Sequence, residues 1–276
     1  MTDAPLDIAA VRAAFDAQVR RSGQASEPGD VVQVSDEVVR WVAPGTQTSC
    51  IIWSGLTEAT ADRAVAAQKQ YFTARGTPVE WKYYDYDRPA DLPARLIAAG
   101  FEPEDEELML VAETSAIETS VALPAGVRLV PVTDEAGIAA MTAVHDRAFT
   151  DHPSPDLAER LLSQLSQAPE TLAMVVAMAG DEPVSAARIE FVPGTDFAGL
   201  WGGGTVPAWR GRGIFRALVA YRAGLAAERG YRYLQVDALP TSRPILERLG
   251  FQPIARTTPY VFHPVGSGGA RPDAAG

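Results

Sequence analysis

Hydrophobic positions recur along this chain with two spacings, about every 3.6 residues and every second residue, and the two spacings alternate through two successive blocks. In the first block they predict helices at residues 6–21, 57–75 and 89–99 and strands at 31–34, 38–42, 50–53, 79–86 and 107–111. In the second block they predict strands at 127–130, 172–179, 184–192, 197–206, 231–237, 252–256 and 260–263, and helices at 134–149, 154–167, 213–228 and 242–249. Helices and strands mixed in this way indicate an α/β fold.

The two blocks resemble each other. When the chain is shifted by 150 residues, six residues fall on identical ones, and both stretches read strand, helix, Gly-Phe, strand. The matched pairs are Tyr83/Tyr233, Asp87/Asp237, Leu96/Leu246, Gly100/Gly250, Phe101/Phe251 and Pro103/Pro253. This internal duplication predicts a domain at 1–115, a linker at 116–125, a second domain at 126–264 and a disordered tail at 265–276.

Composition agrees with two globular domains. The 276 residues are 47% hydrophobic and 21% charged, which is ordinary globular usage. The single cysteine, Cys50, excludes an internal disulfide and reads as a buried apolar residue, and the three histidines are too scattered for a metal site. Asp3 and Asp7 stand where a signal peptide would be basic, and no apolar run could span a membrane. We therefore expect a cytoplasmic protein without a metal; its oligomeric state is not indicated.

Charge is distributed unevenly. The net charge of −11 argues against binding to nucleic acid. Residues 1–125 hold 20 acidic and 10 basic side chains, whereas residues 126–276 hold 15 and 14. Within the second block, residues 210–256 contain nine arginines and only three acidic residues. A basic segment in an acidic protein is where we expect a small anionic ligand.

The segment with the clearest chemistry is T-V-P-A-W-R-G-R-G-I-F-R-A-L, residues 205–218. It joins the end of a strand to the start of a helix through a tight basic turn. Gly211 and Gly213 allow a ligand to approach the backbone, the first N–H groups of the helix are unpaired, and Arg210, Arg212 and Arg216 add positive charge. The segment therefore predicts an anion site; the alternative is a helix with a solvated arginine-rich face.

This segment resembles the GNAT superfamily of N-acetyltransferases, whose signature Q/R-x-x-G-x-G/A binds the pyrophosphate of acetyl-CoA. Arg210, Gly211, Arg212, Gly213 and Ile214 match, whereas Phe215 stands where the family has Gly or Ala. The resemblance covers residues 127–264 and implies that two central strands part to admit pantetheine along residues 203–205. The residues that it implies for coenzyme binding are Gly203, Gly204, Thr205, Arg210, Gly211, Arg212, Gly213, Ile214, Phe215 and Arg216.

The three glycines Gly202 to Gly204 fit a β-bulge with close backbone approach, or else relief of crowding beside Trp201 and Trp209. The first block follows the same order of elements but carries Glu58 where a basic turn is needed. It therefore resembles a degenerate copy, and the whole chain resembles tandem GNAT proteins: two GNAT-like domains, each a mixed, mostly antiparallel sheet flanked by helices. We expect the first domain to pack on the second and shape its acceptor side.

Catalytic residues are less clear. Leu246 stands where many family members carry a tyrosine that protonates the leaving thiolate. Tyr260 is the substitute donor that we consider, against a core tyrosine, and His152 is a candidate base or acceptor contact, against an exposed loop histidine.

The resemblance implies an acetyl-CoA-dependent transferase that acetylates a primary amine by direct attack in a ternary complex. One alternative is a non-catalytic acyl-CoA sensor or scaffold. Another is a mycothiol-synthase-like or antibiotic-modifying tandem acetyltransferase.

Overall fold

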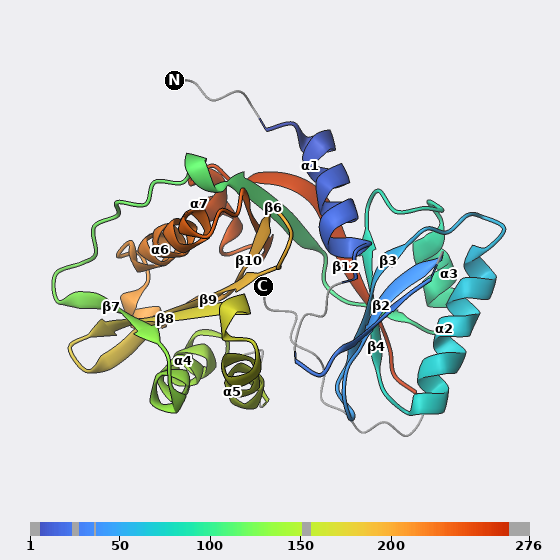
Figure 1. The fold of residues 1–276 in the computed structure, drawn as a ribbon, viewed down its shortest axis with the longest axis horizontal. Helices are drawn as coiled ribbons and strands as arrows, with labels where there is room; N and C mark the ends of the chain where they lie inside the picture. The colour runs from blue at the N-terminus through green and yellow to red at the C-terminus, as the bar shows by residue number, and fades with distance from the viewer. Residues whose placement is uncertain (1–5, 24–27, 36, 151–155, 265–276) are drawn as a thin grey trace. The chain divides into compact units, whose positions relative to one another are not determined.

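The fold is that of a computed structural model, which describes residues 6–23, 28–35, 37–150 and 156–264 (Figure 1). The contacts between residues divide the chain into two compact units. We call Leu110–Pro253 the C-terminal unit, and Asp7–Met109 together with residues 254–264 the N-terminal unit. The predicted tail at 265–276 lies outside the described residues. No helix in the described part of the chain is long and apolar enough to cross a membrane.

The N-terminal unit is a mixed sheet with helices. Its strands lie in the order β1-β2-β3-β4-β12, with β5 added to β12, and every pair with a defined register is antiparallel except β3–β4. Helices α2 and α3 lie on one side of this sheet (Figure 1). The elements are α1 (Ile8–Phe15), its π-helical continuation η1 (Asp16–Arg20), β1 (Val31–Val34), β2 (Val38–Val42), β3 (Ser49–Ser54), α2 (Ala61–Arg75), β4 (Val79–Tyr84), α3 (Leu92–Ala98), β5 (Glu102–Pro103), the start of β6 (Glu107–Glu113) and most of β12 (Gln252–Phe262).

The C-terminal unit repeats this plan. Its strands lie in the order β6-β11-β10-β9-β8-β7, in which β10–β11 is parallel and β7–β8, β8–β9 and β9–β10 are antiparallel. The predicted α/β class with mixed, mostly antiparallel sheets is confirmed. The elements are η2 (Thr114–Ala116), β7 (Val127–Val132), α4 (Glu135–Ala148), α5 (Leu157–Gln167), η3 (Pro169–Thr171), β8 (Leu172–Ala179), β9 (Glu182–Phe191), β10 (Phe197–Thr205), η4 (Pro207–Trp209), α6 (Ile214–Glu228), β11 (Tyr233–Ala238) and α7 (Arg243–Arg248).

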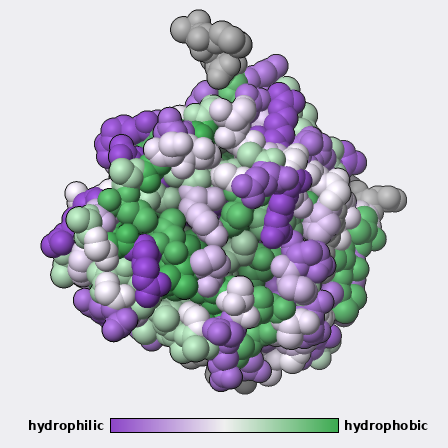
Figure 2. All heavy atoms as spheres, turned by 60° about the vertical axis from the view of Figure 1, so that its left-hand side comes forward, coloured by the Kyte–Doolittle hydropathy of each residue, from purple (hydrophilic) through white to green (hydrophobic). Residues whose placement is uncertain are grey.

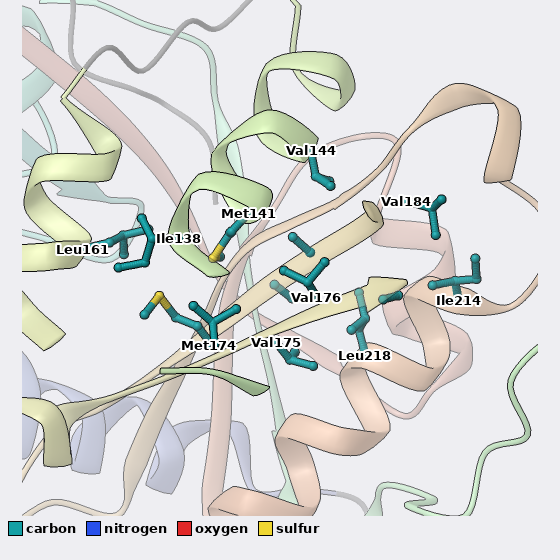
Figure 3. Packing of buried hydrophobic residues seen from close by; sticks show 14 of the residues in the cluster. Ile138, Met141, Val144, Leu161, Met174, Val175, Val176, Val184, Ile214 and Leu218 are labelled. Carbon is teal, nitrogen blue, oxygen red and sulfur yellow. The ribbon is translucent and has the colours of Figure 1, made fainter. Parts of the chain in front are cut away.

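The core of the C-terminal unit lies on both faces of its sheet. Successive β8 residues Met174, Val175 and Val176 are all at most 3% exposed, so both faces of the strand are covered. Helix α4 brings Met141 to one face and α6 brings Leu218 to the other (Figure 3). Because neighbouring side chains on a strand point to opposite faces, a continuous apolar run such as β8 requires a layer of helix on each side.

The two units exchange their last strands. Most of β12 belongs to the N-terminal unit, where six residues from Thr257 to Phe262 pair with β4. The end of β6, from Leu110, belongs to the C-terminal unit, in which β6 is the neighbour of β11. The sequence-based boundaries, which assigned residues up to 115 to the first domain and 126–264 to the second, differ from this division. Strand pairing is decided by partners distant in sequence, which periodicity does not reveal.

A buried ion pair fixes the turn after β4. Arg20, 2% exposed, donates from Nη2 to both carboxylate oxygens of Asp87 at 2.9 and 2.8 Å and from Nε to the carbonyl oxygen of Ile52 at 2.9 Å. Its Nη1 donates to Asp16 at 2.8 Å, and Asp87 also accepts the N–H of Tyr84 at 3.1 Å. Asp87 is therefore a structural carboxylate, and its oxygens satisfy a buried cation.

The strand exchange predicts that the halves of the chain depend on each other. We expect the fragments 1–120 and 121–276 each to lack a cooperative thermal transition, because each loses a strand that completes its sheet. Co-expression of the two fragments should restore a cooperative thermal transition in both units. Circular dichroism melting of each fragment and of the pair measures this. A cooperative transition of 121–276 alone, at the temperature of the full chain, would contradict the exchange.

The buried pair predicts a large cost for Asp87→Ala. Removing the carboxylate leaves Arg20 buried without its main counter-charge, which costs about 3–5 kcal/mol. Asp91→Ala is the matched control, since Asp91 pairs with Arg95 on the surface, where an ion pair contributes about 0–1 kcal/mol. Denaturant unfolding of the three proteins measures the difference, and equal losses would refute the structural role of Asp87.

Candidate functional site

The site begins where two parallel strands of the C-terminal unit separate. β10 and β11 pair only from Phe197 to Gly199, opposite Tyr233 to Gln235, although both strands continue beyond these residues. Beyond the last pair a pocket opens between the strands and the helices α6 and α7. Its lining residues are Leu200, Gly203, Phe215, Arg222, Val236, Ser242 and Leu246. The separation of strands that the resemblance implied is thus present, and it leaves the edge of β10 that faces β11 unpaired.

The three glycines of β10 form a bulge. The pairing with β9 shifts between Trp201 and Gly204, and Gly202 has a φ of +56°, a conformation that strains other residues. A Cβ on Gly203 would lie 2.9 Å from the Phe215 ring, and one on Gly204 would lie 2.7 Å from the ring of Phe149. The predicted bulge is therefore present, and the glycines relieve crowding, as the alternative supposed. The crowding neighbours are Phe215 and Phe149, not the two tryptophans.

The loop after β10 leaves the start of α6 open. Gly211 and Gly213 have φ values of +74° and +81°, and a Cβ on either would meet nothing within 4 Å. Gly213 occupies the N-cap of α6, where no side chain caps the helix, and the first turn holds no acidic residue. The first N–H groups of α6 therefore have no partner within the helix, and an anion could bind them.

The three loop arginines differ in what they contact. Arg210 donates from Nε to the carbonyl oxygen of Thr205 at 3.0 Å and from Nη2 to that of Ala148, the last residue of α4, at 3.1 Å. It therefore braces the end of β10 against the C-terminal end of α4. The Arg212 guanidinium lies 4.5 Å from the centre of the Trp209 ring, and Arg216 is exposed in the first turn of α6. Arg212 and Arg216 are thus the two better placed for an anionic ligand.

The remaining predicted coenzyme residues lie around the bulge. Ile214 is buried in the core of the unit, and Phe215 lines the pocket beneath Gly203. The hydroxyl of Thr205 lies 2.7 Å from that of Ser185, which also hydrogen bonds to the carbonyl oxygen of Gly204 at 2.7 Å. The side chains of Thr205 and Ser185 therefore secure the end of β10.

A buried arginine in the pocket was missed by the sequence analysis. Arg222, in α6, is 2% exposed, and it donates from Nε to the carbonyl oxygen of Leu218 and from Nη1 to that of Arg188, both at 3.0 Å. Burial lowers the pKa of Arg222 to about 9, with a further contribution from the charge of Arg188, so the guanidinium stays protonated at pH 7. The spacing in the sequence could have revealed this burial, because Arg222 follows Ile214 and Leu218 at intervals of four and so lies on the apolar face of α6.

Of the two predicted catalytic residues, the described part of the chain includes Tyr260 and not His152. Tyr260 belongs to the core of the N-terminal unit, pairs with Trp81 of β4, and lies edge-on to Tyr83 with ring centres 6.2 Å apart. Burial raises its phenol pKa. Its placement corrects the expectation that it belongs to the same domain as the loop, and it agrees with the alternative of a core tyrosine. His152 lies outside the described residues, so its role stays a prediction.

The corresponding helix start in the N-terminal unit is closed. The N–H of Ala61, the first residue of α2, donates to the carbonyl oxygen of Thr57 at 3.0 Å. Asp62 lies in the first turn and pairs with Arg95 at 2.8 Å, and Glu58 is exposed beside them. A carboxylate in the first turn and a bonded N–H both oppose an anionic ligand. This copy therefore lacks the open, basic features of the α6 loop.

Comparison with known proteins agrees with this geometry. Residues 138–251 match the model of the acetyltransferase (GNAT) family. No curated protein matches the chain. Among solved structures, a GCN5-related N-acetyltransferase from Kribbella flavida has a TM-score of 0.67 at 17% identity, over 94% of this chain and 96% of its own.

Two further structures resemble most of the chain. A tandem GNAT protein from the clavulanic acid biosynthesis pathway has a TM-score of 0.61 at 14% identity, over 89% of this chain and 86% of its own. A conserved protein of unknown function from Staphylococcus epidermidis has a TM-score of 0.65 at 14% identity, over 91% and 98%. The tandem GNAT fold that the sequence suggested is confirmed.

The bulge predicts that Gly203→Ala destabilises the C-terminal unit. The added methyl group would press on the Phe215 ring, and such overpacking costs about 1–3 kcal/mol. Phe215→Leu in the same chain should recover most of the loss, because the shorter side chain makes room.

Gly224→Ala is the matched control. Gly224 lies inside α6 with no atom closer than 4.0 Å to an added Cβ, so alanine should stabilise by about 0.5–1 kcal/mol. Denaturant unfolding measures all four proteins. If Gly203→Ala and Gly224→Ala shift stability in the same direction, the close approach at Gly203 is not the constraint described.

Proposed function

Because residues 138–251 match the model of the acetyltransferase (GNAT) family, we propose that the protein transfers an acetyl group from acetyl-CoA to a primary amine within a ternary complex. The observation that supports this most directly is the open start of α6, with Arg212 and Arg216 beside it and no acidic residue in its first turn. A pyrophosphate fits such a place, because unpaired N–H groups, the helix dipole and two guanidinium groups all favour negative charge.

The unpaired edge of β10 is the second support. Beyond Gly199 this edge has no partner strand, so an extended pantetheine arm could hydrogen bond along Gly203 to Thr205 as a further strand would. A backbone N–H at the bulge would point at the thioester carbonyl oxygen and stabilise the negative charge that develops there. The residues of the loop and of β10 therefore bind and orient; they do not form covalent bonds.

Acetyl-CoA supplies a thioester whose carbonyl carbon accepts the lone pair of the amine, so a C–N bond forms, the C–S bond breaks, and the thiolate leaves. The surplus proton of the amine passes to a base or to water. Leu246, which lines the pocket, cannot protonate the thiolate. A thiol with a pKa near 8.5 can leave without a side-chain acid. The chain therefore contributes mainly position and electrostatics, with His152 kept as the predicted base.

A non-catalytic acyl-CoA sensor is the second candidate. The absence of a hydroxyl at position 246 favours it, whereas the loop suits both functions. Turnover of acetyl-CoA with a panel of primary amines separates the two, because a sensor binds the thioester and consumes none of it.

The proposal predicts one acetyl-CoA bound per chain, held by the C-terminal unit. Arg212→Glu and Arg216→Glu should each weaken binding about ten- to hundredfold, because each loses a charge-assisted contact and adds repulsion. Arg210→Gln should lower thermal stability as well, because Arg210 braces two carbonyl oxygens. Calorimetric titration and thermal melting measure both effects.

Arg128→Glu is the matched control, with the same change of charge on β7, at the far edge of the sheet in the same unit. Its binding should stay within about twofold of the original, since exposed charges beyond a Debye length of roughly 8–10 Å are screened. Unchanged affinity in both Arg212→Glu and Arg216→Glu, or two bound molecules per chain, would refute the assigned site.

A further inference from the structure

The pocket between β10 and β11 contains a fixed positive charge that the proposed reaction does not use. Arg222 reaches it from the third turn of α6, and only 2% of the residue is exposed. Its two hydrogen bonds go to neutral carbonyl oxygens, one on its own helix and one on β9. Nη2, the remaining nitrogen, lies 3.6 Å from the place that a Cβ on Gly203 would occupy, at the wall of the pocket.

No carboxylate of the described residues balances this charge. The other charged group that acts on Arg222 is Arg188, which is also a cation. Arg188 pairs through Nε with Glu190 at 2.9 Å, so that carboxylate already has a partner. The other buried arginine among the described residues, Arg20, is held by both oxygens of Asp87. Arg222 thus differs from a structural arginine by lacking an anion.

The surroundings of Arg222 suit a small anionic group. The pocket lining is apolar at Leu200, Phe215, Val236 and Leu246. Ser242 adds a hydroxyl, which hydrogen bonds to the carbonyl oxygen of Leu239 at 3.2 Å. An apolar wall with one or two aimed polar groups is how small-ligand sites combine affinity with orientation. A guanidinium recognises a planar carboxylate well, because its N–H groups match the two oxygens.

This place is separate from the expected phosphate site. Arg222 follows Ile214, the first residue of α6, by eight positions, which is roughly 12 Å along a helix. A diphosphate at the start of α6 would therefore not reach it. A substrate group beside Arg222 would therefore belong to the reacting end of that substrate.

We propose that Arg222 binds a carboxylate carried by one of the two substrates, in the pocket where β10 and β11 separate. This inference rests on the proposed acyltransferase function and refines it. The carboxylate has two possible sources: the far end of a dicarboxylic acyl group on CoA, as in malonyl- or succinyl-CoA, or the acceptor, which would then be an amino acid. In either case the reacting carbonyl or amine is held beside the bulge at Gly203.

The first arm of the test is binding without acceptor. Calorimetry compares acetyl-, butyryl-, malonyl- and succinyl-CoA on the full-length protein and on Arg222→Met, which keeps the length of the side chain and removes its charge. If the acyl group carries the carboxylate, we expect malonyl- or succinyl-CoA to bind ten- to hundredfold more tightly than butyryl-CoA. Arg222→Met should remove this preference.

The second arm uses turnover with the preferred thioester. It compares α-amino acids with their methyl esters, which carry the same amine without the carboxylate. If the acceptor carries it, kcat/KM should favour the free acids by ten- to hundredfold, and Arg222→Met should abolish that ratio. Arg222→Lys, which keeps the charge but lacks the paired N–H groups of a guanidinium, should retain part of either preference. Arg128→Met, an exposed position on β7, should change neither.

The outcomes separate the two levels of the proposal. Acetyl-CoA bound and turned over with no preference for a carboxylate in either arm overturns the role of Arg222 and leaves the acyltransferase intact. No binding of any acyl-CoA overturns both. A structural role would instead lower the melting temperature of Arg222→Met with its preferences unchanged, and that result also overturns the inference. If Arg222→Met fails to fold, the preferences of the original protein and of Arg222→Lys still decide.

Discussion

The separation of β10 from β11 is the constraint on which the rest of the site depends. It requires β10 to bend while both of its faces stay packed, and three consecutive glycines solve separate parts of that problem. Gly202 adopts a positive φ, Gly203 makes room for Phe215, and Gly204 makes room for Phe149. A side chain at Gly203 would press on Phe215 of α6, and one at Gly204 would press on Phe149 and Ala148 at the end of α4. The pocket and the unpaired strand edge are therefore two consequences of one local backbone geometry.

The two units show how one plan can be open or closed. In both, a parallel strand pair ends early and a helix starts beside it. In the C-terminal unit the start of α6 has no side-chain cap and is flanked by arginines. In the N-terminal unit the N–H of Ala61 donates to the carbonyl oxygen of Thr57, and Asp62 adds negative charge to the first turn of α2. The difference between the copies thus lies in a few residues at one helix terminus. The molecular surface mixes hydrophilic side chains with several hydrophobic areas on the face that Figure 2 presents.

Local features could be predicted from the sequence. The basic loop, the bulge glycines and the helix ends at Gly76 and Gly100 depend on residues close together in the chain, so the local sequence predicts them. The exchange of β6 and β12 was not, because two duplicated sheets offer each final strand two similar places. The two closing strands expected at 252–256 and 260–263 are one strand, β12, since Thr257 to Pro259 also pair with β4. Tyr260 lies in the N-terminal unit because its strand, β12, pairs with β4 there.

Arg222 carries a charge that its own hydrogen bonds do not require. Two hydrogen bonds to carbonyl oxygens contribute about 1 kcal/mol each, and a neutral donor could make them. Burying a guanidinium costs several kcal/mol unless an anion offsets it. Arg20 has that anion in Asp87, which accepts hydrogen bonds from it through both oxygens. Arg222 has no such anion, and its third nitrogen, Nη2, lies at the wall of the pocket. A substrate carboxylate bound as we propose would supply the missing anion and offset this cost.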